Sequence, residues 1–300
     1  MAIPSYPVFK PLERDDKQLF ESYYSKRGIA ISDHTFTNYY IWRKLDRTQL
    51  TIIGGYLCPM VIGPDKKSHF MMPLGDGEIR GVVKACLEHT GSIIRVDEAF
   101  KTALGESEEY KIAEDREQFD YIYPAKDLAE LKGRRYDAKR NHINAFLKKS
   151  DFTYEAMGAR HIEECLQLNE IWCKKKKSEN EEFPNLECEA EAVKEALLNK
   201  DFLGLSGGVL ISGGKIIAFS LGQKLTEDTA VIHIEKSDPS LRGAAQLMNR
   251  EFVRNEWAGF AYINREQDMG HPGLRKAKES YHPAGMGKKY NISQTKARQE

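Results

Sequence analysis

Several features that would each point to a class of protein are scarce in this sequence. Cysteine occurs five times in 300 residues, and no Cys-x-x-Cys pair is present. This is typical of reduced thiols in a cytoplasm rather than of a disulfide framework. The most apolar stretch, residues 203–225, is interrupted by six glycines, whereas a membrane-spanning helix needs about 20 mostly apolar residues. The N-terminus has no signal-peptide pattern. We therefore expect a soluble, cytoplasmic protein.

Net charge and the common catalytic motifs are also missing. Lysine plus arginine and aspartate plus glutamate each number 45, and the isoelectric point is near 7.1, so a nucleic-acid site would have to be local. The sequence contains no HExxH motif and no cysteine–histidine cluster, which predicts no metal site. It also lacks a GxSxG nucleophile motif, a phosphate-binding P-loop and a dinucleotide-binding fingerprint.

The chain is long enough for two compact domains, since domains most often contain about 100–150 residues. Apolar periodicity predicts helices and strands that alternate throughout, among them a strand at 92–96 and a hairpin that turns at 212–214. The second half has the order helix, helix, strand hairpin, strand, helix, strand, helix, strand, which is the layout of GNAT acyltransferases, and the first half is similar. We predict an α/β (α+β) protein with a tandem GNAT-like fold: two mixed sheets, each flanked by helices, in domains 1–130 and 131–300.

The first candidate site combines a strand with the start of a helix. His233 and Glu235 alternate along a predicted strand and so face the same side, where they could handle the proton of an attacking amine or hydroxyl. Arg242 and Gly243 open the next helix among small residues, which would let backbone N–H groups approach a coenzyme pyrophosphate. An ordinary helix start would produce the same pattern.

The second candidate site follows a short predicted strand at Tyr262. It contains many ionisable groups, and the predicted helix 273–281 places Lys278 and Tyr281 one turn apart on one face. A lysine ammonium beside a phenol suits the negative charge that develops on a carbonyl oxygen. The alternative is a structural network of ion pairs that joins Glu266 and Asp268 to Arg275 and Lys276. The polar residues assigned here to binding substrate or phosphate are Asn264, Glu266, Asp268 and Arg275.

The third candidate site is a basic segment, residues 131–149, with a local charge of about +6 from its lysines, arginines and one aspartate. Arg140, Asn141 and Asn144 lie on the polar side of the predicted helix, which suits contacts to phosphate in tRNA, a phospholipid headgroup or a coenzyme. A solvated connector between the two halves is the alternative.

Three runs of residues resemble a known bacterial family. They are KRNHIN at 139–144, HIEK at 233–236 and YINREQDMGHPGLRKAKESYHP at 262–283. The chain is similar to the C-terminal catalytic domain of phosphatidylglycerol lysyltransferase and, more distantly, to Fem peptidyltransferases. The resemblance implies aminoacyl transfer from a charged tRNA to a lipid or other acceptor. It also implies that Lys278, followed by Tyr281 and Pro283, stabilises the oxyanion. The long membrane-spanning half of the lysyltransferase is not matched.

Three functions remain open at this point. The first is transfer of an aminoacyl group from aminoacyl-tRNA to an amine or hydroxyl, with Glu235 or His233 managing the proton. The second is an N-acyltransferase that uses acyl-coenzyme A, held at Arg242 and Gly243. The third is a catalytically silent module that binds RNA or a partner through the basic segment. We expect the catalytic site in the second half and at most peripheral contact with membrane lipid.

Overall fold

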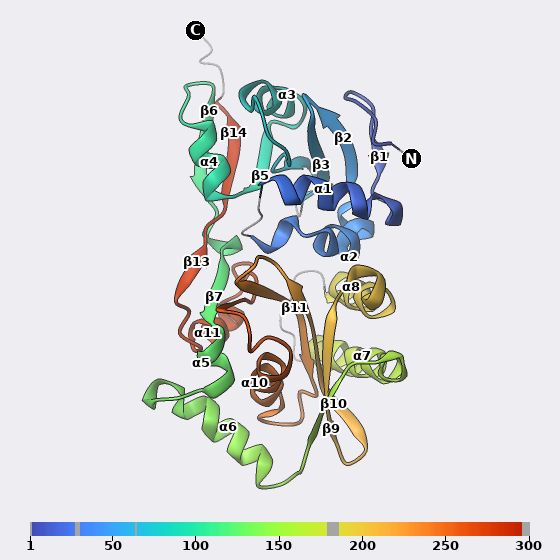
Figure 1. The fold of residues 1–300 in the computed structure, drawn as a ribbon, viewed down its shortest axis with the longest axis vertical. Coiled ribbons are helices and arrows are strands. Elements are labelled where there is room, and N and C mark those ends of the chain that lie inside the picture. The colour runs from blue at the N-terminus through green and yellow to red at the C-terminus, as the bar shows by residue number, and fades with distance from the viewer. Residues whose placement is uncertain (1, 28–30, 64, 179–185, 296–300) are drawn as a thin grey trace. The chain divides into compact units, whose positions relative to one another are not determined.

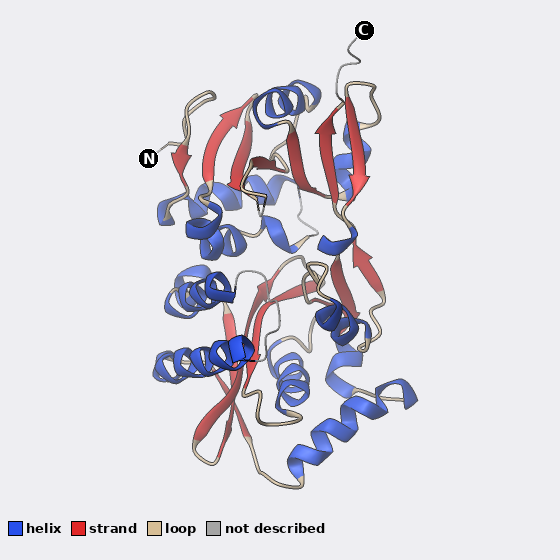
Figure 2. Cartoon of the chain, turned by 180° about the vertical axis from the view of Figure 1, so that it is seen from behind, coloured by secondary structure: helices blue, strands red, loops and turns tan. Residues whose placement is uncertain are grey.

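The computed structural model describes residues 2–27, 31–63, 65–178 and 186–295, and its elements form two compact units (Figure 1). The first unit contains residues 1–120 and 287–300, and the second contains residues 121–286. Each unit is built on a mixed seven-stranded sheet, with helices packed against it (Figure 2). Within the described part of the chain, no helix is both long and apolar enough to cross a membrane.

The sheet of the first unit has the strand order β1-β2-β3-β4-β5-β14-β6. β4 and β5 are parallel, and the other neighbours whose register is resolved are antiparallel. The strand between β5 and β6 therefore comes from the far end of the chain. The strands are β1 (Lys10–Pro11), β2 (Gln49–Ile53), β3 (Tyr56–Ile62), β4 (Ser68–Met71), β5 (Ser92–Val96), β6 (Tyr110–Glu114) and β14 (Tyr290–Gln294).

Amphipathic helices cover this first sheet. Val83, Cys86 and Leu87 lie on one face of α3 and are buried, as the spacing of apolar residues predicts. The Thr35 side chain accepts a hydrogen bond from the Asn38 N–H and so caps α2. The helices of this unit are α1 (Lys17–Arg27), α2 (Phe36–Asp46), α3 (Arg80–Thr90) and α4 (Glu98–Leu104).

The sheet of the second unit has the order β13-β7-β12-β11-β10-β9-β8. β11 is the central strand. It is parallel to β12, whereas the pairs β7–β12, β10–β11, β9–β10 and β8–β9 are antiparallel. The strands are β7 (Asp120–Pro124), β8 (Thr153–Ala156), β9 (Ser206–Ser212), β10 (Lys215–Lys224), β11 (Thr229–Ser237), β12 (Tyr262–Asn264) and β13 (Gly285–Gly287).

Helices cover both faces of the second sheet (Figure 1). α10 buries Leu247, Met248 and Phe252 against one face, and α7 with α8 covers the other. Lys236, which alternates with Glu235 on β11, contacts Glu189 on that second face. The helices are α5 (Ala125–Glu130), α6 (Asp137–Leu147), α7 (Ile162–Ser178), α8 (Leu186–Leu198), α9 (Lys200–Leu203), α10 (Ala244–Glu256) and α11 (Pro272–Glu279).

The division into units differs from the predicted limits of 1–130 and 131–300. The first unit ends at Asp120, so β7 and α5 belong mainly to the second unit, and the chain returns to the first unit at Gly287. The reason is that β14 pairs with β5 and β6. A strand partner nearly 200 residues away leaves no local signal in the sequence.

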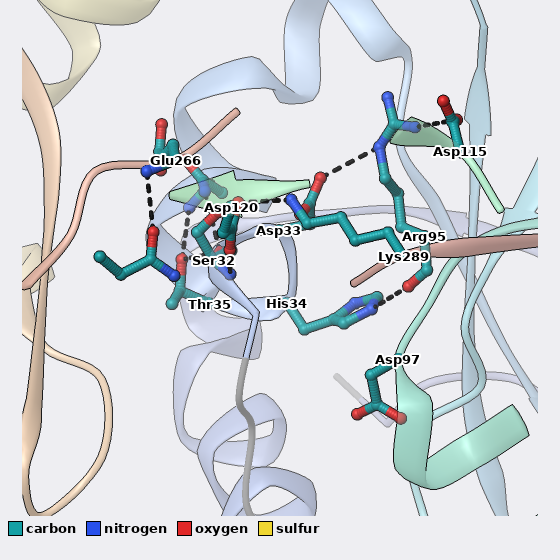
Figure 3. A network of polar contacts seen from close by, with 12 residues as sticks. Ser32, Asp33, His34, Thr35, Arg95, Asp97, Asp115, Asp120, Glu266 and Lys289 are labelled. Atoms are coloured by element: carbon teal, nitrogen blue, oxygen red, sulfur yellow. Dashed lines mark hydrogen bonds and ion pairs between the residues drawn. The ribbon is translucent and has the colours of Figure 1, made fainter. Parts of the chain in front are cut away.

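A buried charged network, not expected from the sequence, joins this returning segment to the rest of the first unit (Figure 3). Lys289 is fully buried and pairs with Asp33 and, at 2.6 Å, with Asp120. The backbone N–H of Ser32 donates to Asp120 at 2.8 Å, and Arg95 pairs with Asp33 at 3.1 Å. Because these charges neutralise one another, they can be buried together.

Three of the four cysteines whose side chains the structure describes lie in the interior. Cys58, Cys86 and Cys165 are buried and Cys173 is partly exposed, all as free cysteines. The side chain of Cys188 lies outside the described residues.

Candidate functional site in the second unit

The candidate site lies where two parallel strands of the second sheet separate. β11 and β12 pair only from Thr229 with Tyr262 to Val231 with Asn264. β12 then ends, while β11 continues to Ser237. Ligands of open α/β sheets bind at the carboxyl ends of strands, where neighbouring strands part. The polar residues that follow on both strands therefore occupy a place suited to a ligand.

A hydrogen bond and an ion pair link β11 to the segment that follows β12. His233 Nδ1 lies 2.8 Å from Glu266 Oε1, with the His233 side chain 1% exposed. Glu235 Oε1 lies 3.2 Å from Arg265 Nη2, and the other Glu235 oxygen accepts a hydrogen bond from Asn249 at 3.1 Å. Both side chains reach residues that follow β12, although the pairing of β10 with β11 shifts register between Leu221 and Gly222, opposite His233. Both oxygens of Glu235, however, are already engaged.

Three buried polar atoms in this cluster have no hydrogen-bond partner among the described residues. They are His233 Nε2, Asn249 Oδ1 and Arg265 Nη1. A buried polar atom without a partner is costly, by about 1–3 kcal/mol, and calls for an explanation wherever it occurs in a native protein. Water, an ion or a bound ligand could supply the missing partners.

The aromatic ring of Tyr281 is flanked by two cationic groups. Lys139 Nζ lies 4.0 Å and the Arg265 guanidinium carbon 4.8 Å from its centroid. Burial, together with repulsion from Arg265, lowers the pKa of Lys139 to about 8. Burial alone would lower the pKa of Arg265, but the carboxylate of Glu235 outweighs it and the pKa is raised. The sequence predicted Lys278 beside Tyr281; α11 ends at Glu279, and the cations that lie over the Tyr281 ring are those of Lys139 and Arg265.

Lys278 instead binds backbone. Its Nζ donates to the carbonyl oxygens of Arg265 and, at 3.1 Å, of Glu266. Asn264, which is fully buried, accepts the Glu266 N–H at 2.7 Å. Glu266 has φ of +56°, a left-handed conformation uncommon for a non-glycine residue. These contacts hold the turn that directs Arg265 and Glu266 toward β11.

Asp268 and Arg275 form a separate ion pair beside the site. Arg275 Nε and Nη2 donate to the two Asp268 oxygens at 2.9 and 3.0 Å, and the Tyr121 hydroxyl donates at 2.6 Å. Burial opposes ionisation of Asp268, but the hydrogen bonds from Arg275, Tyr121 and the Gly270 N–H outweigh it and lower its pKa to about 2. This agrees with the structural alternative for this pair, since Arg275 is engaged with Asp268.

The turn at Arg242 and Gly243 is packed against α6. Gly243 has φ of +98°, and a Cβ at this position would lie 2.3 Å from the carbonyl oxygen of His142. Arg242 Nε lies 3.1 Å from His142 Nδ1. A glycine is therefore required by helix packing, and the backbone of α6, rather than open space, faces the beginning of α10.

The basic segment contributes one residue to the cluster, Lys139. Arg140 donates to the carbonyl oxygens of Leu131 and Gly133, at 2.9 Å for Gly133, and pairs with Asp137. It thus stabilises the chain entering α6 rather than reaching the cluster. Asn141 and Asn144 lie on the exposed side of α6.

Sequence reasoning missed three residues of the cluster: Lys139, Asn249 and Arg265. Lys139 was counted only as part of the basic run, and Asn249 stands among the buried apolar residues of α10. A buried amide in an apolar helix face is a usable signal, because such a group needs a polar partner. Arg265 lies between Asn264 and Glu266, both of which were singled out.

Comparisons with known proteins identify the relatives of this chain. The sequence profile of the family described as phosphatidylglycerol lysyltransferase, C-terminal, matches residues 27–293. A conserved protein of unknown function from Bacteroides thetaiotaomicron is 34% identical, with a TM-score of 0.85 over 96% of this chain and 99% of that one. L-PGS from Bacillus licheniformis is 14% identical, with a TM-score of 0.63 over 99% and 95% of the two chains.

A curated relative matches over only part of its length. An uncharacterised protein from Mycoplasmoides gallisepticum is 24% identical over 182 residues, which is 58% of this chain and 55% of that protein. The chain thus spans about half the length of the curated relative it matches. The predicted α+β class with two mixed sheets flanked by helices is confirmed, and the structural matches share this fold over nearly the whole chain.

Proposed function

Because the chain belongs to the family of the phosphatidylglycerol lysyltransferase C-terminal domain, we propose that it transfers an aminoacyl group from aminoacyl-tRNA to an amine or hydroxyl acceptor, which includes a lipid headgroup. Family and fold support an acyltransferase. The observation that carries the proposal further is the group of three unpartnered buried polar atoms at the parting of β11 and β12. Transfer of this kind needs a group that accepts a proton and a group that binds the carbonyl oxygen, and the cluster can supply both.

His233 is the residue we assign to the proton. Glu266 holds Nδ1 and leaves Nε2 without a partner, which is the arrangement that orients a histidine to act as a base. Glu235 is less suited to that task, since Arg265 and Asn249 occupy both of its oxygens. In this scheme Glu235 orients Arg265, and His233 takes the proton of the attacking group and returns it to the leaving ribose oxygen.

Lys278 then has a positioning role. Its ammonium group joins the carbonyl oxygens of Arg265 and Glu266 and fixes the turn that presents both side chains. The ring of Tyr281 packs against the cationic groups of Arg265 and Lys139.

Exposed residues of the basic segment are proposed to contact tRNA. Arg134, Lys148 and Lys149 are exposed, and phosphate contacts of this kind position a nucleic acid without reading its sequence. Use of coenzyme A at Arg242 and Gly243 is disfavoured, because both residues pack against His142 of α6.

The test is transfer of radiolabelled amino acids from bulk charged tRNA, with extracted bacterial lipids and small amines as acceptors. We expect transfer by the natural protein, and a loss of about 10²–10⁴-fold in kcat for His233→Ala, the usual contribution of a general base. Glu266→Gln should lose less, since it only orients His233.

The matched control is His89→Ala, an exposed histidine of α3 in the first unit, which should transfer at the natural rate. Unchanged turnover in His233→Ala would remove this histidine from the mechanism. No transfer from any charged tRNA by the natural protein would remove the proposed donor.

A further inference from the structure

The surroundings of Tyr281 bring together two positive charges. Lys139 comes from α6 and Arg265 from the turn after β12, and both lie within 5 Å of the centre of one ring. Tyr281 itself is almost fully buried. Like charges gathered in a partly dehydrated place repel each other strongly, because the effective dielectric constant there is lower than in water.

The protein leaves these two charges incompletely neutralised. Arg265 meets one carboxylate, Glu235, and its buried Nη1 has no partner among the described residues. Lys139 meets no carboxylate within 4.0 Å among those residues. The Lys139 ammonium group donates a hydrogen bond to the Ser280 hydroxyl at 2.6 Å. That hydroxyl donates in turn to the carbonyl oxygen of Ala277.

The remaining groups around Lys139 do not supply the missing negative charge. Glu235 on β11 attracts it, while Arg265 after β12 repels it. His142, one turn further along α6, carries a pKa lowered by burial, by Arg242 and by Lys139 itself. Tyr281, after α11, has a pKa raised by burial and so stays neutral. A negatively charged ligand would supply that missing charge.

We propose that Lys139 and Arg265 form an oxyanion-binding subsite that receives the negatively charged oxygen formed from the aminoacyl carbonyl. The subsite rests on the proposed function and assigns to this pair the role that the sequence assigned to Lys278. Lys278 is committed to two backbone carbonyl oxygens, whereas Arg265 Nη1 is a buried donor without an acceptor.

The step balances in atoms and charge. The nitrogen or oxygen of the acceptor forms a bond to the carbonyl carbon of the aminoacyl ester and gives its proton to His233 Nε2. The carbonyl electron pair moves to oxygen, which becomes the anion held by Lys139 and Arg265. When the carbonyl re-forms, the bond to the ribose oxygen breaks, and that oxygen takes the proton from His233.

Binding of two paired adenosine derivatives tests the subsite without turnover. One carries an aminoalkylphosphonate monoester, a stable tetrahedral anion, and the other carries an amide-linked amino acid, which is planar and neutral at the corresponding atom. By calorimetry, we expect Lys139→Met to weaken phosphonate binding at least ten-fold and to leave the amide within two-fold. Lys139→Arg should retain most of the phosphonate affinity. Equal losses for both ligands, or no loss for either, would overturn the subsite.

The protonation of Lys139 provides a second readout. After ¹³C-methylation of the lysines, the Lys139 signal should titrate near pH 8 in the free protein and at higher pH with methylphosphonate bound, since an anion favours the charged form. An unmoved signal contradicts the subsite even if a methionine variant fails to fold. A moved signal in a protein that transfers no aminoacyl group would retain the anion subsite and refute the proposed function. Full turnover by Lys139→Met would refute the anion subsite and leave the proposed function standing.

Discussion

The carboxyl group of Asp268 illustrates what a single residue contributes here. It accepts two hydrogen bonds from Arg275 and one each from Tyr121 and the Gly270 N–H, and its pKa is lowered to about 2. A carboxyl whose pKa is lower in the folded than in the unfolded chain adds stability above its unfolded pKa of about 4. That stability disappears as the pH falls from about 4 to 2.

We therefore expect Asp268→Asn to lower the free energy of unfolding at pH 7 by about 1–2 kcal/mol, a range discounted for solvent near Arg275. Urea unfolding at several pH values measures this. The difference between natural and variant proteins should stay constant above pH 5 and shrink toward pH 2. A difference that persists at pH 2 would point to lost packing rather than to charge.

The sequence predicted which residues belong to the site better than it predicted which side chains contact one another. The strand period placed His233 and Glu235 on one face, and the pairing of Asp268 with Arg275 was among the alternatives. The partners of the first two could not be assigned, because Glu266 meets His233 only through a left-handed backbone conformation at 266. No spacing rule encodes that conformation for a glutamate.

At the scale of elements, the contact between α10 and α6 depends on Gly243. A Cβ there would lie 2.3 Å from the His142 carbonyl oxygen and would carry φ of +98°. Gly204 ends α9 with φ of +73° and has open space around the same position. Substituting alanine at both glycines therefore distinguishes two costs in the free energy of unfolding. At Gly204 only the backbone conformation is strained, whereas at Gly243 the new Cβ also clashes with a neighbouring atom.

We expect Gly204→Ala to lower the free energy of unfolding by about 1 kcal/mol, the usual penalty for a left-handed alanine. Gly243→Ala should cost about 2–4 kcal/mol, because α6 must also move. Chemical denaturation followed by circular dichroism compares them. Equal losses of unfolding free energy would mean that α6 moves away from the new Cβ at no measurable cost.

Elements with local signals were predicted well, and those that depend on distant partners were not. The turn at Gly213 and Gly214 marked the hairpin of β9 and β10, and both residues have positive φ. The strand at 92–96 has its predicted limits. β6 went unpredicted: its polar sequence, YKIAE, becomes a strand by pairing with β14.

At the scale of the whole molecule, the first unit depends on Lys289. This fully buried lysine neutralises Asp33 and Asp120, and its pKa is raised because these carboxylates outweigh the effect of burial. Removing one partner from a buried ion pair costs about 3–5 kcal/mol, since the remaining charge is left uncompensated.

Lys289→Met should therefore destabilise the first unit by about 3–5 kcal/mol, and the double variant with Asp120→Asn should recover part of that loss. Hydrogen–deuterium exchange read by mass spectrometry locates the effect. Faster exchange should be concentrated in peptides from residues 2–120 and 287–295. Uniform acceleration through residues 121–286 as well would show that the two units unfold as one.

The place of β14 has a consequence for how the protein is made. The sheet of the first unit has a vacancy between β5 and β6 until residues 290–294 have been synthesised, whereas the strands of the second unit lie within a continuous segment. Domains generally fold as units while the chain emerges from the ribosome. The earlier half must wait with two unpaired strand edges while the later half folds, and a ribosome that stops near residue 286 releases a chain whose first sheet is incomplete. Unpaired edges of this kind promote aggregation.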